Sequence, residues 1–226
     1  MLVSICVSVF NREDTIRQCL DSILNQTYKE IEVLILDDCS TDNSWSILQE
    51  YYLKDSRIRL LKNDHNLGPA RSAETLYNLS KGVFIGTVDS DDYIDLECIE
   101  LCVKHIGAAG LIYTYCKHFG DNEALNTRAQ YTYTKEALLN FFMVFHFRLF
   151  RKQYWDKIKY FETKRYCYDY ELALRLSELC EFKLLPKILY YWRIHNNQLT
   201  QTKELSSRRE EYYFIQERAK LRRNII

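Results

Sequence analysis

The segment FIGTVDSDDY at residues 84–93 is an apolar run of β type that ends abruptly in acids. The acids are Asp89, Asp91 and Asp92. Carboxylates this close repel one another, and a strand end tolerates them when a cation or a hydroxyl-rich ligand lies between them. A solvated loop or a helix cap explains the same acids equally well. The surrounding sequence therefore has to distinguish a ligand site from a loop.

Strand-like and helix-like segments alternate around this one. Apolar β runs lie at residues 3–10, 32–36, 58–61 and 84–88. A helical pattern follows each of the first three runs. We expect Asn11 to cap the first of these helices and Pro69 to occupy the first turn of the third. The alternation predicts the α/β class, with a parallel sheet and right-handed crossovers.

Polar side chains stand where these strands end. They are Ser8, Asn11, Asp37, Asp38, Asp89 and Asp91. In open α/β sheets, ligands bind beyond the carboxyl ends of the strands, near a switch in strand order. Carboxylates at several strand ends suit ribose hydroxyls, a base N–H or a metal ion, and they do not suit bare phosphate.

The second half of the chain is less regular. We expect strands at residues 111–115, 145–150 and 187–192, helices at 135–142 and 169–179, and a mildly basic helical tail to residue 226. Thr134 is predicted to cap the helix at 135–142. Several aromatic and basic residues between 145 and 168 either stack on sugar rings or pack in the core. They are Phe147, Arg148, Arg151, Tyr154 and Trp155.

Composition excludes several classes of protein. The chain has 226 residues with a net charge of +0, so no overall field attracts nucleic acid. The sequence contains no GxGxxG, GxxxxGK[ST] or GxSxG motif. The eight cysteines form no CxxC pair, which argues against a zinc site. The first residues lack the features of a signal peptide, and no apolar run approaches the roughly 18 residues of a membrane span. We therefore expect reduced thiols and a cytoplasmic protein.

Six segments, in order, resemble the family 2 glycosyltransferases of the GT-A fold. They are SVFNRED at 8–14, LNQTY at 24–28 with EVLILDDCSTDNS at 32–44, Asn66, Gly68 and Ala70-Arg71, VDSDD at 88–92, YDYELALRL at 168–176, and LYYWRIHNNQLT at 189–200. The resemblance covers about residues 1–200. The chain departs from the family pattern at Tyr168, where Glu is common, and at Ser72, where Asn is usual.

The resemblance implies a GT-A domain at residues 1–200 and a helical tail at 201–226. A Rossmann-like half with a mainly parallel sheet, residues 1–92, would bind the nucleotide sugar, and a smaller half, 93–200, would bind the acceptor. The implied reaction is a single, inverting displacement that moves a sugar from a nucleoside-diphosphate sugar, by default a UDP-sugar, to a hydroxyl of a glycan or lipid-linked saccharide.

The resemblance also implies a divalent ion, Mn²⁺ or Mg²⁺, that neutralises the leaving diphosphate. Asp91 is the expected ligand, and Asp89 either shares the ion or holds a ribose hydroxyl. Asp92 either takes one of these functions or caps the following helix. His195 is the expected third protein ligand, and a surface residue is the alternative. Asp169 is the expected general base, although it would also serve as the N-cap of its helix.

The remaining expected contacts are with the nucleotide. Asp38 would accept the base N–H, Asp37 would support its loop, and Ser8 and Asn11 would lie at the base. Glu13 would reach the ribose, or would only complement a helix dipole. Arg71 would contact the base or the diphosphate, or would only pair with Glu74.

Two other functions compete with an active transferase. One is a non-catalytic nucleotide-sugar-binding or scaffold subunit with the same fold. The other, a sugar nucleotidylyltransferase, is disfavoured because the first strand lacks a Gly- and Arg-rich loop. The basic end of the tail either contacts a membrane surface or a partner, or is a solvated helix. The sequence leaves the oligomeric state open.

Overall fold

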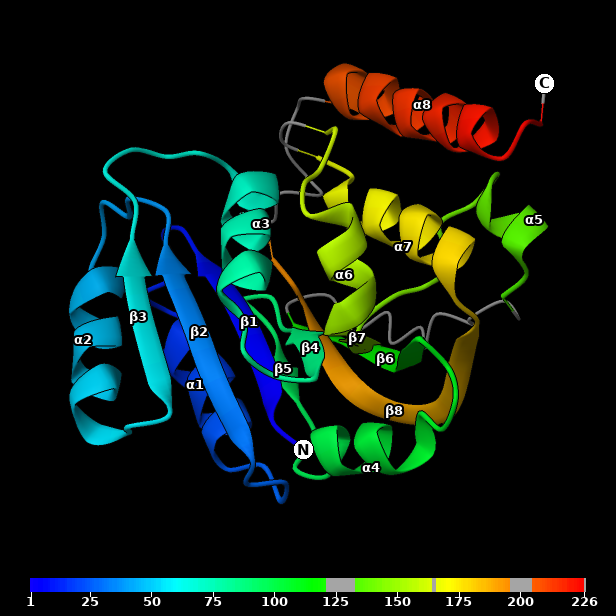
Figure 1. Ribbon diagram of the computed structural model, residues 1–226. Helices are drawn as coiled ribbons and strands as arrows, with labels where there is room; N and C mark the ends of the chain where they lie inside the picture. The colour runs from blue at the N-terminus through cyan, green and yellow to red at the C-terminus, as the bar shows by residue number, and fades with distance from the viewer. Residues whose placement is uncertain (121–132, 164–165, 196–204, 226) are drawn as a thin grey trace.

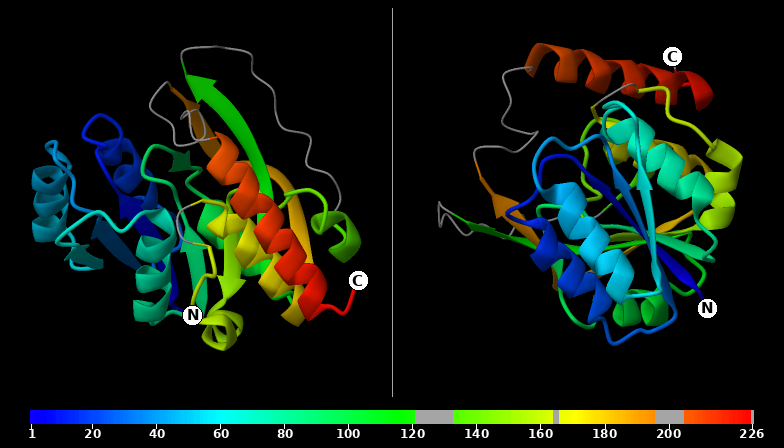
Figure 2. Two further views of the ribbon diagram at one scale, coloured as in Figure 1. Left: turned by 90° about the horizontal axis from the view of Figure 1, so that it is seen from above. Right: turned by 90° about the vertical axis from the view of Figure 1, so that its left-hand side faces the viewer.

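The computed structural model describes residues 1–120, 133–163, 166–195 and 205–225. One eight-stranded sheet, in the order β3-β2-β1-β4-β7-β6-β8-β5, runs through the molecule (Figures 1 and 2). The strands are β1 Val3–Val9, β2 Ile31–Asp37, β3 Ile58–Lys62, β4 Phe84–Thr87, β5 Tyr93–Ile94, β6 Leu111–Gly120, β7 Arg148–Arg151 and β8 Phe182–Ile194. The helices are α1 Ile16–Leu24, α2 Ser44–Lys54, α3 Pro69–Leu79, α4 Cys98–His105, α5 Lys135–Leu138, α6 Lys152–Ile158, α7 Tyr168–Leu179 and α8 Leu205–Arg222.

The first four strands are parallel, which confirms the predicted α/β class. β1 pairs with β2 on one side and with β4 on the other, and β3 joins beyond β2. β7 then runs antiparallel between β4 and β6, so the sheet continues without a break into the second half of the chain. Because β1, β2 and β4 share one direction, the polar residues after Val9, Asp37 and Thr87 meet at one edge of the sheet.

Apolar layers cover both faces of the sheet. On one face the odd-numbered residues of β1 pack with α1, α2 and α4. On the other face, β2 and β4 side chains pack with α3, α6 and α7. The predicted apolar stripe of α1 is confirmed, because its members are all buried: Ile16, Cys19, Leu20 and Ile23. Burial on both faces explains why these strands are continuous apolar runs rather than alternating ones.

The structure corrects two predicted helix caps. Asn11 does not cap α1, because the helix begins after Thr15, and Asn11 has a φ of 53° in the connecting loop. Asp169 lies inside the first turn of α7, and Cys167 is the N-cap. The cap at Thr134 is confirmed, since its Oγ1 accepts the Ala137 N–H at 3.0 Å.

Several elements differ from the predicted ones in extent. The strand expected at 145–150 is β7 Arg148–Arg151, and the helix expected at 135–142 is only α5 Lys135–Leu138. β5, α4 and α6 were not predicted. β8 is longer than expected because it continues through Pro186, where its register with β6 shifts. A proline lacks the N–H that a regular ladder needs, so the strand tolerates it at this irregularity.

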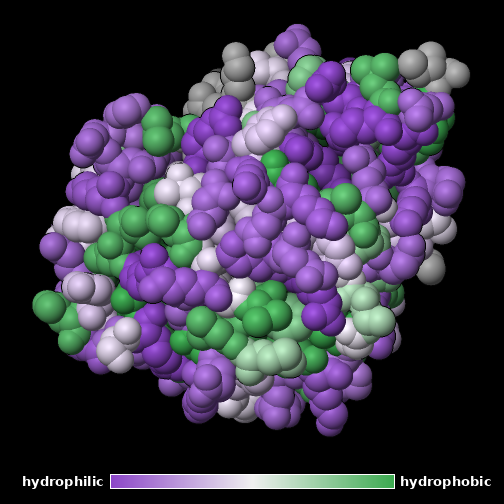
Figure 3. Space-filling view, in the orientation of Figure 1, coloured by the Kyte–Doolittle hydropathy of each residue, from purple (hydrophilic) through white to green (hydrophobic). Residues whose placement is uncertain are grey.

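Helix α8 lies on the outside of the second half (Figure 1). It packs against α7 through Ile215 and Ala219, which are buried. Its basic residues Arg218 and Arg222 both pair with Glu162. The face shown in Figure 3 is mainly hydrophilic where α8 lies, which agrees with this charged surface. Among the described residues, no helix combines the length and the apolar character needed to cross a bilayer.

Candidate active site

The acids of residues 89–92 form a tight turn at the carboxyl edge of the sheet. The turn is closed by the Asp92 N–H, which donates to the Asp89 carbonyl at 3.0 Å. The Asp92 side chain is only 2% exposed, and its two oxygens accept from the Tyr190 hydroxyl and the Arg193 N–H, both at 2.7 Å. Protein donors thus engage both oxygens of Asp92, which favours a positioning role over the predicted contact with the nucleotide.

Asp91 and His195, predicted together as metal ligands, are adjacent in the structure. The His195 Nε2 lies 3.1 Å from the Asp91 Oδ2, and both side chains retain some exposure. The Arg12 Nε lies 3.3 Å from the same Oδ2, a contact that was not predicted. Carboxylate oxygen and imidazole nitrogen are ligands that Mn²⁺ accepts. Among the described residues, no group of three or more His, Cys, Asp and Glu side chains is arranged to hold a metal, so this pair would need further ligands from beyond those residues.

Asp89 faces a buried imidazole. Its Oδ2 lies 3.2 Å from the Nε2 of His146, whose ring stacks on that of Tyr190 with centroids 4.9 Å apart. The Asp89 side chain is 42% exposed, but the protein crowds its carboxylate on the remaining sides. This burial and the charge of Asp91 raise the pKa of Asp89 to about 7. Burial and the nearby Arg148 hold the pKa of His146 well below its usual value, so this histidine is neutral at pH 7.

Arg148 connects this group to the expected base. Its Nη1 lies 3.5 Å from the Asp169 Oδ2, and its Nη2 lies 2.9 Å from the His146 Nε2. The guanidinium is 2% exposed and also donates to the Val144 carbonyl at 3.2 Å. A chain of contacts therefore runs from Asp89 through His146 and Arg148 to Asp169.

Neither His146 nor Arg148 was predicted to act at the site. Arg148 was considered only as a residue that stacks on sugar rings or packs, and the structure shows it packed, with Phe147 and Trp155 fully buried nearby in sequence. The available signal was a histidine and an arginine inside the otherwise apolar run VFHFRLF at residues 144–150. A charged residue in a core strand needs a partner of opposite charge, and the partner here is the partly exposed Asp169.

The two acids at the end of β2, Asp37 and Asp38, differ in how many of their carboxylate oxygens accept hydrogen bonds from the protein. Asp38 accepts from the Asn63 side chain and the Leu67 N–H with Oδ1, and from the Gly68 N–H with Oδ2, at 2.7–2.9 Å. It thereby fixes the loop before α3. Asp37 is fully buried, and its Oδ1 has no hydrogen-bond partner in the described part of the chain. The contacts favour Asp38 as the residue that supports the loop, which is the role expected of Asp37.

Three further residues that were expected to contact the nucleotide instead bind other groups of the protein. Asn11 Oδ1 accepts the Thr41 N–H at 2.8 Å and joins two loops at the sheet edge. Glu13 Oε2 accepts from the N–H and side chain of Asn43, at the start of α2. Arg71 pairs with Glu74 at 2.7 Å, which is the alternative left open by the sequence.

A small hollow remains beside Asp89. Ser8 from β1, Thr87 from β4, Tyr168 from α7 and residues of α3 line it together with Asp89. This hollow lies at the junction of β1 and β4 with the helical layer, so it brings Ser8 to Asp89 as the strand-end pattern predicted. Asp169 follows Tyr168 in α7, and Arg148 ties it to the same region.

Comparison with known proteins gives the site a context. The family Glycosyl transferase family 2 matches residues 4–166. The chain is 33% identical over 221 residues to a chondroitin synthase of Escherichia coli and 31% identical over 220 residues to a hyaluronan synthase of Pasteurella multocida. Each match covers 95% of this chain but only 32% and 22% of the relative, so the chain spans a third or less of their length.

Solved structures show the same fold. Staphylococcus aureus TarS 1–349 in complex with UDP-GlcNAc has a TM-score of 0.79 at 21% identity, covering 95% of this chain and 64% of that one. The mannosyltransferase PcManGT from Pyrobaculum calidifontis, in complex with GDP-Man and Mn²⁺, has a TM-score of 0.70 at 16% identity, covering 97% and 64%. These neighbours confirm the predicted GT-A fold.

Proposed function

The chain belongs to glycosyl transferase family 2, and from this premise we propose that it is a catalytic domain that moves a sugar from a nucleoside-diphosphate sugar to an acceptor hydroxyl. The observation that carries the proposal is the convergence of Asp91, His195 and Asp169 at one edge of the sheet. Asp91 contacts His195 directly, and Asp169 is joined to the same turn through Arg148, His146 and Asp89. A scaffold subunit would have no need of this arrangement.

The donor set fits a divalent cation, Mn²⁺ or Mg²⁺. Asp91 and His195 would bind it, and Asp89, partly exposed beside them, would share it or hold a ribose hydroxyl. When bound, such an ion neutralises charge on a leaving diphosphate. The neighbour that holds GDP-Man and Mn²⁺ supports this choice. Asp92 would act indirectly, because Tyr190 and Arg193 use its oxygens to fix the turn.

Asp169 would act as the general base. An acceptor hydroxyl at its carboxylate would lose a proton to Asp169 as the hydroxyl oxygen attacks the sugar from the side opposite the diphosphate. That single displacement inverts the anomeric configuration. Arg148, fully enclosed beside Asp169, would orient the carboxylate. The general base Asp169 lies in helix α7, and Arg148, which orients it, lies in strand β7, so neither residue depends on a loop for its position.

The donor is proposed to be a UDP-sugar, as in the neighbour that binds UDP-GlcNAc. Ser8, which lines the hollow beside Asp89, is the candidate group for the base. Relatives named as chondroitin and hyaluronan synthases favour a glycan acceptor. The domain would then work at the cytoplasmic side of polysaccharide assembly.

The test is donor turnover in the complete chain. Purified protein is incubated with a panel of UDP-sugars and Mn²⁺, and UDP release is followed with and without EDTA. Asp169→Asn should keep donor affinity within about threefold and reduce turnover by at least about 100-fold, since a positioned base contributes 10²–10⁴-fold. Asp156→Asn, an exposed acid on α6, is the matched control and should behave as wild type. No donor-induced thermal shift and no UDP release would favour the scaffold alternative.

A further inference from the structure

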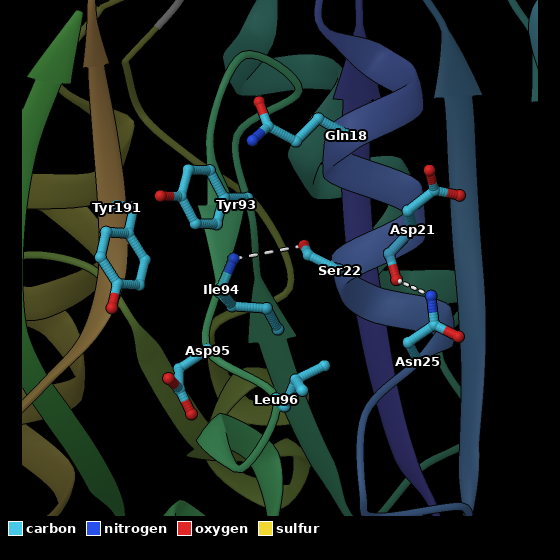
Figure 4. Close-up of a pocket in the computed structure, with 9 residues that line it drawn as sticks. All are labelled: Gln18, Asp21, Ser22, Asn25, Tyr93, Ile94, Asp95, Leu96 and Tyr191. Carbon is cyan, nitrogen blue, oxygen red and sulfur yellow. Dashed lines mark hydrogen bonds between the residues drawn. The ribbon is translucent and has the colours of Figure 1, made fainter.

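An open groove of about 430 Å³ lies between helix α1 and the edge strand β5 (Figure 4). One wall is a polar face of α1 and its C-terminal cap, whose members are three and four residues apart: Gln18, Asp21, Ser22 and the cap residue Asn25. The opposite wall includes Tyr93, Asp95 and Tyr191. The proposed transfer gives none of these residues a role.

Two tyrosine rings form the apolar part of the groove. Tyr93 and Tyr191 are direct cross-strand partners on β5 and β8, and their rings stack with centroids 4.5 Å apart and planes 8° apart. The edge of Phe119 supports Tyr93 at 5.0 Å. Neither tyrosine is fully buried, both line the groove, and Figure 4 shows the two rings side by side, with Tyr93 between Tyr191 and α1. A supported aromatic surface of this kind packs well against the C–H face of a pyranose ring, because both are flat and apolar.

Each of two carboxylates in the groove is held by a hydrogen bond to one of its oxygens, and its other oxygen can accept a hydrogen bond from a ligand. Asp21 Oδ1 accepts from the Tyr51 hydroxyl at 2.7 Å, and Asp95 Oδ1 accepts the Glu97 N–H at 3.0 Å. The Oδ2 of each takes no protein hydrogen bond within the described part of the chain. Ionised carboxylates only accept hydrogen bonds, so they match sugar hydroxyls.

The charge of the groove selects among sugars. Its lining contains Asp21 and Asp95 and no Lys or Arg among the described residues. The two carboxylates repel a uronate, sulfate or phosphate group placed beside them, because like charges at close range are unfavourable. The lining therefore fits a neutral hexose or N-acetylhexosamine.

The groove adjoins the candidate active site at one end. The Gln18 side chain accepts a hydrogen bond from the Arg193 guanidinium. Arg193 in turn donates from Nε to the Asp91 carbonyl at 2.9 Å and from its backbone N–H to Asp92. From there the groove follows β5 away from the turn, toward Asn25 (Figure 4). A glycan whose reacting end lies in the candidate active site can therefore continue along this path.

We propose that this groove binds a neutral hexose unit of the acceptor or product glycan, remote from the reacting end. The proposal rests on the proposed transferase function for the identity of the glycan. The binding itself is independent of donor turnover.

The test is direct binding of defined hexasaccharides to the full chain without donor, by saturation-transfer NMR. The neutral probes are N-acetylchitohexaose, maltohexaose and cellohexaose, and a hyaluronan hexasaccharide is the acidic comparison. At least one neutral probe should bind, and more tightly than the acidic one. Tyr191→Leu should weaken that binding on the order of tenfold, the upper range for loss of one aromatic stack. Tyr213→Leu, which alters an exposed tyrosine on α8, should leave it unchanged.

A second groove variant tests whether binding is lost because the groove is altered or because Tyr191→Leu is misfolded. Asp21→Ala, on the exposed side of α1, should weaken the neutral saccharide severalfold while preserving the thermal unfolding temperature within a few degrees. The proposal is overturned if no neutral probe binds, or if both groove variants bind as wild type does. Groove binding without any UDP release would instead disprove the transferase proposal alone.

Discussion

Tyr190→Phe should destabilise the turn at residues 89–92, because it removes the hydroxyl that holds the turn to β8. The Tyr190 hydroxyl donates to Asp92 Oδ2 at 2.7 Å and accepts the Asp89 N–H at 3.1 Å, so it joins both ends of residues 89–92 to β8. The residue is fully buried, and its ring stacks on His146. Phenylalanine keeps the ring and its packing and removes only the hydroxyl.

The cost follows from the two groups left without a partner. A buried donor or acceptor that loses its partner costs about 1–3 kcal/mol. Burial and the charge of Asp91 raise the pKa of Asp92, which makes its carboxyl a weaker acceptor than a fully ionised one. We therefore take the lower part of the range for each group and expect a loss of about 2–4 kcal/mol. In a domain of this length that corresponds to a fall in Tm of roughly 4–16 °C.

Differential scanning calorimetry measures the loss of stability. A Mn²⁺ titration of UDP-sugar turnover measures a second effect, the loss of affinity for the metal ion. Residues that hold metal ligands in place typically contribute 10–100-fold to metal affinity. The Mn²⁺ concentration that gives half-maximal turnover should therefore rise on the order of tenfold. Tyr191→Phe is the matched control, because its hydroxyl has no protein partner in the described part of the chain. Its Tm should stay within about 1 °C of wild type. A Tyr190→Phe protein with wild-type Tm and Mn²⁺ midpoint would refute the positioning role of Tyr190 and Asp92.

Two further outcomes are expected. Arg148→Met preserves side-chain volume in the core but removes the cation beside Asp169 and the donor to the Val144 carbonyl, so calorimetry should show a loss of about 1–3 kcal/mol. Turnover should fall on the order of 100-fold while donor affinity stays within about threefold, and an equal loss of donor affinity would contradict this. Gly82→Ala would place a Cβ 2.6 Å from the Ser4 backbone nitrogen and 2.8 Å from its Oγ, so β1 or the turn must shift; calorimetry should show a loss of about 1–3 kcal/mol, and an unchanged Tm would show that the turn yields freely.

The periodicity of the first half was sufficient to predict its sheet. Strands buried on both faces are continuous apolar runs, and helices between them have an apolar stripe, so β1 to β4 were recognisable without a structure. In the second half β5 has two residues, and β8 contains Pro186, so local patterns were too short or too irregular. Helices α4 and α6, with eight and seven residues, were missed for the same reason.

Residue type located the site but did not assign its members. Asp91 and His195, which the family resemblance placed together as metal ligands, lie side by side although 104 positions separate them. Asp38, Asn11 and Glu13 were expected to contact ligand, and each is engaged by another loop of the protein. An acid at a strand end looks the same in sequence whether its partner is a nucleotide or a backbone N–H.

The sequence by itself determined the class of fold, the edge of the sheet where polar groups gather, and the family. These depend on periodicity and local order, which a linear chain displays. The tertiary structure alone decided which acids of 89–92 remain available, that His146 and Arg148 join Asp89 to Asp169, and that Tyr93 and Tyr191 line one groove with a polar side of α1. Those facts depend on contacts between residues far apart in the chain, and such contacts exist only once β7 and β8 have entered the sheet.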